Sequence, residues 1–430
     1  MHVPPYKIKV VEPISLPSPE QRREALHRAG YNTFLLRATD VFVDLLTDSG
    51  TSAVSQEQRA AMELGDESYA GSRSFFRLER AVTDVYGYKH TIPTHQGRGA
   101  EHLLSQVLVR PGQLVPSNLY FTTSRAHAEL AGAVWTDVFV PEASVPESTD
   151  PWKGNIDVHR LEDVIRQAGA ENIAFVRQEA CLNMAGGQPF SIANLVEVRA
   201  VTLDYGVPLI LDGTRSSENA LFVERHEDGY GHHSLAEILK LIADLSDGAV
   251  FSSKKDHFVP IGGLAAVNDD ALAERLRELV VVYEGFPHYG GMSGAAMEAL
   301  AVGIHEAADE RIVGHYVDQV AYLASLLQEA GVPIVLPPGA HAVFLDAKRF
   351  LPHVPQQHFP AQAHVRLRYL PSELDVDVTD DGGGAAHANG DGAGHGLIGM
   401  RERVALYGGR LEAGPRDGGG FGVRAEIPLA

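Results

Sequence analysis

The stretch Phe251-Ser-Ser-Lys-Lys-Asp-His-Phe-Val-Pro-Ile-Gly-Gly263 decides the fold that we expect for this chain. It separates two short apolar runs, Gly248–Phe251 and Leu264–Val267, whose branched residues and small or polar borders are typical of buried strands. Two adjacent lysines, Lys254 and Lys255, therefore lie at the edge of a predicted core. A lysine in an apolar site has a lowered pKa, and its neutral amine attacks carbonyls. Alternatively, the stretch is a solvated loop with two surface lysines.

Composition excludes several classes of protein. The 430 residues are 44% hydrophobic, which suffices for one or two large cores. A formal net charge of -20 argues against binding to nucleic acid or to an anionic membrane. The single cysteine, Cys181, excludes an internal disulfide and fits a reducing compartment. Because we see neither an apolar run of about 18 residues nor a secretory signal, we expect a cytoplasmic protein that spans no membrane.

Helix and strand patterns alternate between residues 56 and 300, which predicts an α/β fold with a mostly parallel sheet and ligand sites at the carboxyl ends of its strands. The candidate strands are His90–Pro93, Leu119–Thr122, Ala133–Val140, Ile173–Arg177, Pro208–Leu211, Ala249–Ser252 and Leu264–Val267. Outside this region we expect a helix from Ser18 to Gly30, a short strand over Phe42–Leu46 and a helical segment over Met297–Leu327. Two apolar runs, at 332–336 and 342–346, then resemble the start of a smaller α+β domain.

Four features at the predicted strand ends fit one ligand. Thr94-His-Gln-Gly-Arg-Gly-Ala100 opens a helix with glycines and Arg98, a composition that cradles phosphate, although such a stretch is often only a tight turn. Asp212 ends an apolar strand and can pair with a pyridinium nitrogen, or else cap a helix. Phe121 can stack on a planar ring or belong to the core. Asn183 places an amide where it can meet a phenolate oxygen.

The order of these features indicates a class of enzyme. A phosphate cradle, a ring stack, a ring-nitrogen carboxylate and then a lysine are the layout of pyridoxal-phosphate enzymes of fold type I, the aminotransferase-like fold. The turn Thr47–Ser52 is rich in side-chain donors and acceptors, and it fits a ligand role or local backbone capping equally well.

Long ungapped motifs over residues 6–362 resemble the β-eliminating lyases, the family of tyrosine phenol-lyase and tryptophan indole-lyase. The matching motifs are Phe34-Leu-Leu36, Asp44-Leu-Leu-Thr-Asp-Ser-Gly-Thr51, Gly65-Asp-Glu-Ser-Tyr-Ala-Gly-Ser72, Pro93-Thr-His-Gln-Gly-Arg-Gly-Ala100, Asn183 with Ala185-Gly-Gly-Gln-Pro189, Lys254-Lys-Asp256, Tyr283-Glu-Gly285, Tyr289-Gly-Gly291 and Phe359-Pro-Ala-Gln362.

The resemblance implies a role for each matching residue. Lys255 would be the Schiff-base lysine and the base at Cα, while Asp212 would hold the ring nitrogen and Phe121 would stack on the ring. The phosphate would lie among Gln96, Gly97, Arg98, Ser252 and Lys254. Asn183 and Arg215 would face the phenolate oxygen, and Thr47 and Ser49 would line the substrate site. Tyr69 would be a general acid that also reaches the neighbouring subunit's cofactor. Glu67, with the carbonyls of Gly50 and Pro260, would bind K+.

The resemblance also implies a substrate and an assembly. Phe121-Thr122-Thr123 is similar to the tyrosine enzyme, and we count Thr122 among its catalytic residues, whereas Val259-Pro260 and Glu284-Gly-Phe-Pro287 are more similar to the tryptophan enzyme. We expect conversion of tyrosine to phenol, pyruvate and ammonia, with tryptophan or an S-substituted cysteine as the alternative substrates. The family implies a homotetramer formed as a dimer of dimers. The contrasting hypothesis is a catalytically silent protein with a role in assembly.

The C-terminal residues depart from this pattern. Residues 364–430 resemble a fragment of a sensor histidine kinase ATP-binding domain, through Val378-Thr-Asp-Asp-Gly-Gly-Gly384 and Gly394–Val404. Because the Asn-bearing helix of that family is missing, we expect no ATP binding by this tail. Arg366 is the one candidate for the arginine that binds the substrate carboxylate, and without that arginine we expect impaired turnover. The expected divisions are an arm and small-domain part at 1–50, a cofactor domain at 51–300, a small-domain part at 301–362 and the kinase-like fragment at 363–430.

Overall fold

The computed structural model describes residues 4–7, 13–352, 363–369, 373–380, 404–405, 409–415 and 421–428 of the chain. The chain divides into two compact units. The first contains Met1–Lys9 and Thr47–Asp346, and the second contains Val10–Leu46 and Ala347–Ala430. The four expected domains and their boundaries remain predictions.

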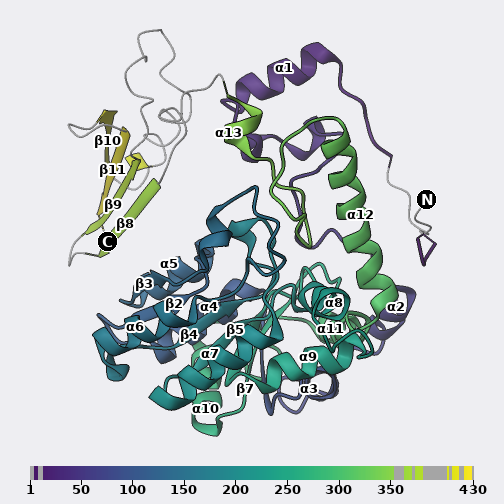
Figure 1. Cartoon of the computed structure of the whole chain (residues 1–430), viewed down its shortest axis with the longest axis vertical. Helices are drawn as coiled ribbons and strands as arrows, with labels where there is room; N and C mark the ends of the chain where they lie inside the picture. The colour runs from purple at the N-terminus through teal and green to yellow at the C-terminus, as the bar shows by residue number, and fades with distance from the viewer. Residues whose placement is uncertain are drawn as a thin grey trace. The chain divides into compact units, whose positions relative to one another are not determined.

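A seven-stranded sheet forms the centre of the first unit, in the order β1-β7-β6-β5-β4-β2-β3 (Figure 1). All neighbours are parallel except β7, which runs antiparallel to both β1 and β6. The mostly parallel sheet that the sequence predicted is therefore confirmed. Its strands are β1 (His90–Thr94), β2 (Leu114–Ser117), β3 (Val134–Asp137), β4 (Val176–Glu179), β5 (Leu209–Asp212), β6 (Gly248–Phe251) and β7 (Gly263–Val267).

Helices cover both faces of this sheet, because each central strand is apolar on both sides. Leu209 and Leu211 of β5 contribute to a core on one face, while Ile210 contributes to a second core on the other. Residues of α4, α5 and α10 pack in the second core, and residues of α3, α6, α7, α8, α9, α11 and α12 pack in the first.

The helices of the first unit follow in chain order, with short 3-10 turns between some of them. They are α2 (Gln56–Met62), α3 (Arg73–Val85), α4 (Gly97–Leu108), α5 (Thr122–Leu130), η3 (Pro141–Ser144), α6 (Val158–Ala168), η4 (Ala170–Asn172), η5 (Asn183–Ala185), α7 (Ile192–Tyr205), α8 (Ser216–His226), α9 (Leu235–Asp244), α10 (Asp270–Tyr283), α11 (Gly294–Glu306) and α12 (Glu310–Glu329).

The second unit combines short helices with an antiparallel sheet. Helix α1 begins where the sequence predicts, because Ser18 and Gln21 form a reciprocal capping box. The sheet has the order β10-β11-β9-β8. The elements of this unit are α1 (Pro19–Arg28), η1 (Thr33–Leu35), η2 (Ala38–Asp40), α13 (Ala347–Phe350), β8 (Ala363–Tyr369), β9 (Glu373–Asp380), β10 (Arg410–Pro415) and β11 (Phe421–Pro428).

Two predicted strands are wrong. The strand expected at Leu119–Thr122 lies earlier, at Leu114–Ser117, and Thr122 instead begins helix α5. β2 lies between β3, with which it pairs from Leu114 to Ser117, and β4, with which it pairs at Ser117. Residues 42–46 form no strand, since Leu45 is 91% exposed and gains no burial from pairing.

The helical segment expected over Met297–Leu327 is confirmed in type and divided in two. Asp309 accepts a hydrogen bond from the backbone N–H of Arg311 and thereby caps a new helix, α12. The runs at 332–336 and 342–346 meet only through an isolated bridge between Ile334 and Leu345.

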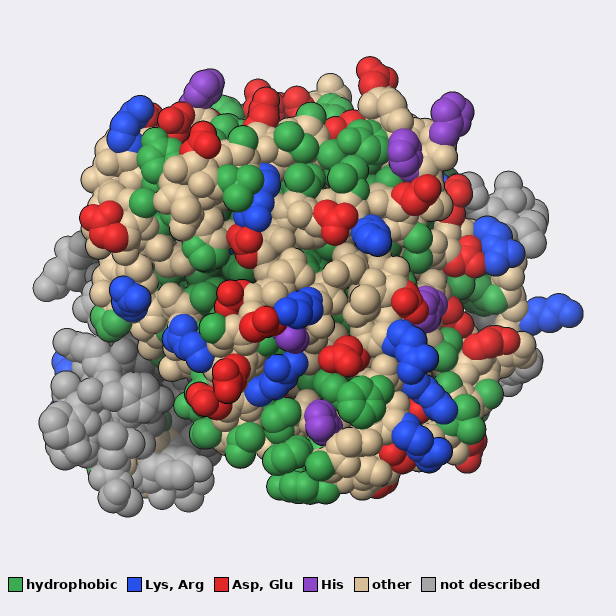
Figure 2. All heavy atoms as spheres, turned by 90° about the horizontal axis from the view of Figure 1, so that it is seen from below, with side chains coloured by type: hydrophobic (Ala, Val, Ile, Leu, Met, Phe, Trp, Pro, Cys, Tyr) green, Lys and Arg blue, Asp and Glu red, His purple; other side chains and the backbone are tan. Residues whose placement is uncertain are grey.

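The charged side chains are mixed in sign on the face that Figure 2 shows. Figure 2 shows one face, on which Lys and Arg side chains lie among Asp and Glu rather than in a continuous basic patch. Among the described residues, no helix combines the length and the apolar character needed to cross a membrane.

Candidate active site

The lysine loop, residues 252–262, joins β6 to β7, which are antiparallel neighbours in register from Gly248↔Val267 to Phe251↔Leu264. Two buried polar side chains of this loop fix it to neighbouring segments. The carboxylate of Asp256 accepts the backbone N–H of Arg215 at 2.8 Å and that of Ser217 at 3.2 Å. The Nε2 atom of His257 lies 2.8 Å from the hydroxyl of Tyr86. The loop is therefore a fixed part of the core and not a solvated turn.

Lys255 is half-buried within this loop, and its Nζ donates to the Ser252 hydroxyl at 3.1 Å. Burial lowers the pKa of Lys255, Asp48 opposes this effect, and the Arg215 guanidinium adds to it. A lysine with a lowered pKa is a better nucleophile and base near neutral pH. The structure thus gives Lys255 the environment that the sequence predicted.

The N-terminus of α4 lies against the same serine. A Cβ atom on Gly97 would come within 2.7 Å of the Ser252 Cβ, so only glycine permits this approach. Gln96 is the N-cap of the helix, and Arg98 lies exposed in its first turn. Free backbone N–H groups and the helix dipole make such an N-terminus suitable for a phosphate. The predicted residues Gln96, Gly97, Ser252 and Lys255 are therefore brought together.

Asp212 ends β5 beside the lysine loop. Its Oδ1 accepts the backbone N–H of Thr214 at 3.1 Å, and the Thr214 hydroxyl accepts the N–H of Ser252 at 2.9 Å. Asp212 is not a helix cap, because α8 begins at Ser216 with Arg215 as its N-cap residue. Its Oδ2 pairs with the Arg177 guanidinium, so a ligand would share a carboxylate that the protein already contacts. The lack of a capping role favours the functional interpretation of this residue over the structural one.

Arg215 adopts a left-handed conformation with φ of +67°, and its guanidinium forms an ion pair with Asp48. Asn183 lies in η5, where its Oδ1 is 2.9 Å from the Nε2 of His341. Burial lowers the pKa of His341, and the charges of Arg215 and Lys255 add to this shift. These contacts connect the predicted residues Arg215 and Asn183 with two side chains, Asp48 and His341, that sequence reasoning missed.

Two other predicted residues line a cavity of about 250 Å³. Glu67 and Tyr69 line it together with Tyr289 and Met292. The Tyr69 ring is 68% exposed and lies 4.5 Å from the ring of Phe286, measured between ring centroids. Its exposure leaves the hydroxyl accessible to a ligand or to another subunit.

The K+ residues are only partly brought together. Gly50 donates its N–H to the Lys254 carbonyl at 2.8 Å, and a Cβ on Gly50 would lie 3.2 Å from the Pro260 carbonyl oxygen, so these two backbone segments touch. The carboxylate of Glu67 instead accepts a hydrogen bond from the backbone N–H of Gly294 at 3.0 Å. Within the described part of the chain, no cluster of three or more His, Cys, Asp or Glu side chains suits a metal ion.

The remaining predicted residues take different positions. Phe121 is the half-buried N-cap of α5, and Thr122 is exposed at its first position. Thr47 is exposed and Ser49 is half-buried in the turn beside Asp48. Arg366 lies on β8 opposite Asp377 of β9, and its side chain lies outside the described residues. The same holds for most of the kinase-like motif, residues 381–403.

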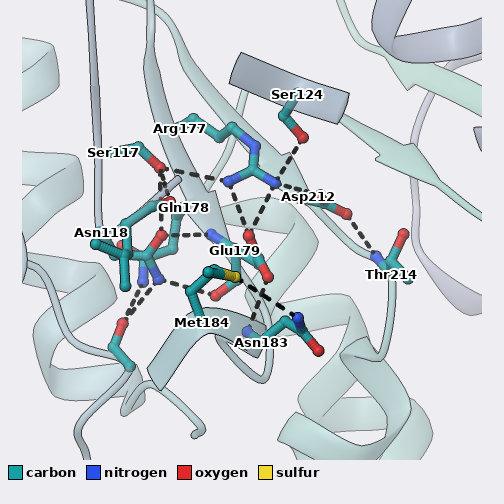
Figure 3. Close-up of polar contacts among 12 residues, drawn as sticks. Ser117, Asn118, Ser124, Arg177, Gln178, Glu179, Asn183, Met184, Asp212 and Thr214 are labelled. Carbon is teal, nitrogen blue, oxygen red and sulfur yellow. Dashed lines mark hydrogen bonds and ion pairs between the residues drawn. The ribbon is translucent and has the colours of Figure 1, made fainter. Parts of the chain in front are cut away.

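Two side chains near Asp212 were missed altogether (Figure 3). Arg177 and Glu179 of β4 are buried, and the Arg177 guanidinium forms ion pairs with Glu179 at 3.0 Å and with Asp212. His341 was missed because it is distant in sequence. The sequence held one signal for this contact, the consecutive glycines Gly186 and Gly187. Both have positive φ, and Gly339 packs closely on the turn that they form.

Solved structures with this arrangement of strands define the class of the fold. A protein of Exiguobacterium sp. 255-15 described as an aromatic amino acid β-eliminating lyase/threonine aldolase superposes with a TM-score of 0.52 at 15% identity, over 89% of this chain and 90% of that one. The serine palmitoyltransferase of Sphingomonas wittichii gives 0.51 at 16% identity, over 95% and 90%. The fold is that of fold type I pyridoxal-phosphate enzymes.

Sequence relatives narrow this class to a family. The family model for β-eliminating lyases matches residues 44–405. The tyrosine phenol-lyase of Symbiobacterium thermophilum is 51% identical over 368 residues, covering 86% of this chain and 80% of the relative. That of Nostoc punctiforme is 51% identical over 366 residues, covering 85% and 78%. The chain belongs to the β-eliminating lyase family, as its motifs indicated.

Proposed function

We propose that this protein is a pyridoxal-phosphate-dependent carbon–carbon lyase that converts L-tyrosine to phenol, pyruvate and ammonia. The observation that carries the proposal is the half-buried amine of Lys255, which lies at the sheet edge between the N-terminus of α4 and the carboxylate of Asp212. The tyrosine phenol-lyases that match most of the chain support this choice of substrate.

The residues present fit this cofactor. Lys255 offers a nucleophilic amine for the aldehyde, and Gln96, Gly97 and Ser252 surround a helix N-terminus that suits the phosphate. Asp212 offers a carboxylate for the ring nitrogen, and Phe121 offers a face for stacking. When bound, the cofactor supplies an electron sink for charge that develops at Cα.

The chain's own residues would then move protons and hold the substrate. Lys255 takes the Cα proton, since its lowered pKa leaves a larger neutral fraction near pH 7. Tyr69 delivers a proton to the ring carbon that leaves as phenol. Asn183 and Arg215 hold the phenolic oxygen of the cofactor. His341 Nε2 lies 2.9 Å from Asn183 Oδ1 and so orients the amide, whose Nδ2 makes a long contact of 4.0 Å with the sulfur of Met184 and has a second N–H to donate.

The finer features of this proposal follow the family. We infer that the active form is a dimer of dimers in the cytoplasm, with Tyr69 crossing an interface, and that Gly50, Pro260 and Glu67 bind K+ once that interface forms. The contact between Gly50 and Pro260 supports the placement of two of these groups. Replacing K+ with Na+ in the assay, with Glu67→Gln as the matched variant, tests the cation. Equal rates in both salts would contradict it.

The central experiment follows the covalent bond and the products separately. Purified protein supplied with pyridoxal phosphate should absorb near about 420 nm, and borohydride should fix the cofactor on the peptide that contains Lys255. Lys255→Ala should abolish the adduct, whereas Lys254→Ala should keep it on the neighbouring lysine. An adduct that persists in Lys255→Ala refutes the assignment. Pyruvate release is then compared for tyrosine, tryptophan and S-methylcysteine, and faster release from either alternative would overturn the choice of substrate.

The C-terminal departure predicts how fast this reaction proceeds. The arginine with which the family binds the substrate carboxylate is not recognisable in this C-terminal stretch, and Arg366 is the one candidate to replace it. Without such a charge-assisted contact, binding loses about 2–5 kcal/mol. We therefore expect full cofactor binding with impaired turnover. Replacing residues 363–430 with an intact family C-terminus should raise pyruvate release by at least about tenfold. A silent assembly protein would show no pyruvate from any substrate in either form.

A further inference from the structure

Arg177, Glu179 and Asp212 form a buried charged cluster at the ends of β4 and β5 (Figure 3). The Arg177 guanidinium lies at its centre. Its two terminal nitrogens donate to the same Oε2 of Glu179 at 3.0 Å, and one of them also pairs with Oδ2 of Asp212 and donates to Ser124 at 3.0 Å. The side chains of Arg177, Glu179 and Asp212 are 4%, 6% and 8% exposed, so water screens none of these contacts.

The sheet itself brings these groups together. Arg177 and Glu179 are two residues apart on β4 and therefore project from the same face, and Glu179 lies beside Asp212 in the parallel register of β4 and β5. The other oxygen of Glu179 accepts the backbone N–H of Asn183 at 3.0 Å. Asn118 holds the backbone of Glu179 through its N–H and its carbonyl. The cluster is thus a rigid part of the sheet edge.

The charges of the cluster do not balance without a ligand. One guanidinium faces two carboxylates, those of Asp212 and Glu179. A third carboxyl, that of Glu101, accepts the Ser124 hydroxyl, and burial raises its pKa. Burial also raises the pKa of Glu179 to about 7, so once Glu179 is ionised the Arg177 ion pairs leave a deficit of one positive charge beside Asp212. A protonated ring nitrogen facing Asp212 would supply that charge.

We propose that Arg177 and Glu179 are positioning residues that set the protonation of the ring nitrogen of bound pyridoxal phosphate. Arg177 pairs with the Asp212 carboxylate and so weakens its attraction for the ring nitrogen. Glu179 pairs with the same guanidinium and opposes that effect. Loss of Glu179 leaves the Asp212 charge balanced by Arg177, so the net negative charge beside the ring disappears, whereas loss of Arg177 leaves two carboxylates that attract the ring proton. The inference rests on the cofactor part of the proposed function and is independent of the substrate.

The test measures the ring nitrogen directly. Holoenzyme is prepared with pyridoxal phosphate labelled with 15N in the ring, and the nitrogen chemical shift, which separates pyridinium from neutral pyridine, is titrated with pH. Glu179→Gln should lower the pKa of the ring nitrogen by about one unit, and Arg177→Gln should raise it by a similar amount. The double variant should return near the wild-type value. Asp212→Asn is the reference for a ring nitrogen that has lost its partner.

Opposite shifts are what a structural role alone would not produce. If both single variants move the pKa in one direction, or neither moves it by a measurable amount, the proposal is overturned. If the wild-type protein binds no cofactor, the proposed function fails instead, so the two failures are distinguishable.

A measurement on the wild-type protein covers the case in which a single variant does not fold, since breaking a buried ion pair is costly. Coupling between two protonation sites is reciprocal. The Glu179 carboxyl is therefore titrated by 13C NMR in protein loaded with pyridoxal phosphate or with a carbocyclic analogue that lacks the ring nitrogen. The charged groups that face Glu179 are Arg177 on its own strand and Asp212 on β5, and they are the same in both samples. The proposal requires a lower pKa of Glu179 with the natural cofactor, and equal values would overturn it.

Discussion

The imidazole of His257 makes the stability of the lysine loop depend on pH. His257 is fully buried two residues after Lys255, and its Nδ1 has no hydrogen-bond partner among the described residues. Burial lowers the pKa of His257 from 6.5 to about 3. The folded chain therefore holds the neutral imidazole, and the stability that depends on it is present above pH 6.5 and is lost as the pH falls from 6.5 toward 3.

The magnitude follows from this difference in pKa. Each unit below 6.5 corresponds to about 1.36 kcal/mol, so the chain should lose about 2 kcal/mol between pH 7.5 and pH 5.0 through this one group. His257→Gln keeps a polar partner for the Tyr86 hydroxyl and removes the titration. The difference in unfolding free energy between pH 7.5 and 5.0 should therefore be about 2 kcal/mol smaller in His257→Gln than in the wild type.

The assay is guanidinium unfolding of the cofactor-free protein, followed by tryptophan fluorescence at the two pH values. The control is His159→Gln, which removes an exposed histidine from α6 and should leave the pH dependence of the wild type unchanged. Parallel losses of stability in the wild type and in His257→Gln would show that this imidazole does not govern the acid lability of the site.

Three further changes test the packing around the site. Gly97→Ala should weaken pyridoxal-phosphate binding at least about tenfold in equilibrium dialysis because its Cβ would displace Ser252, whereas Gly231→Ala, whose Cβ would meet only one backbone oxygen at 3.7 Å, should bind normally. Asp66→Asn should lower the unfolding free energy at pH 7 by about 2 kcal/mol, because hydrogen bonds to the charged carboxylate lower the pKa of Asp66. This loss of stability should shrink below pH 3.8, and an undiminished loss there would contradict the reasoning. Lys153→Met should cost about 3 kcal/mol in the same unfolding assay, since it strands buried carbonyls that its ammonium now satisfies, and a cost below about 1 kcal/mol would contradict the buried role.

The sequence predicted the lysine loop and its two strands because local pattern and tertiary structure agree there. The apolar runs on either side are fully buried, and the helix that begins at Gly97 follows from glycines next to a strand. It failed at Leu119–Thr122 because an apolar run can follow a strand as easily as form one. The break before α12 was missed because a single capping aspartate interrupts an otherwise continuous helical pattern.

The charges around Asp212 could not be found from the sequence. Arg177 was predicted to be the last residue of an apolar strand, and Glu179 lay beyond its predicted end. Their burial depends on each other and on a carboxylate 35 residues later in the chain, so no local period indicates it. The pairing of Asn183 with His341 spans 158 residues and has the same cause. Local patterns therefore predicted most of the elements and the position of Lys255 at the edge of the core, while the electrostatic surroundings required the folded chain.

The antiparallel pairing of β6 with β7 has a consequence for how this chemistry can change. β6 and β7 form backbone hydrogen bonds with each other on either side of residues 252–262. The sheet therefore fixes the two ends of this segment. Substitutions inside it can alter reactivity while the anchoring points remain in place. A designer who wished to transplant this lysine loop into another sheet would need to carry the hairpin together with the outside groups that Asp256 and His257 contact, the backbone of Arg215 and Ser217 and the hydroxyl of Tyr86.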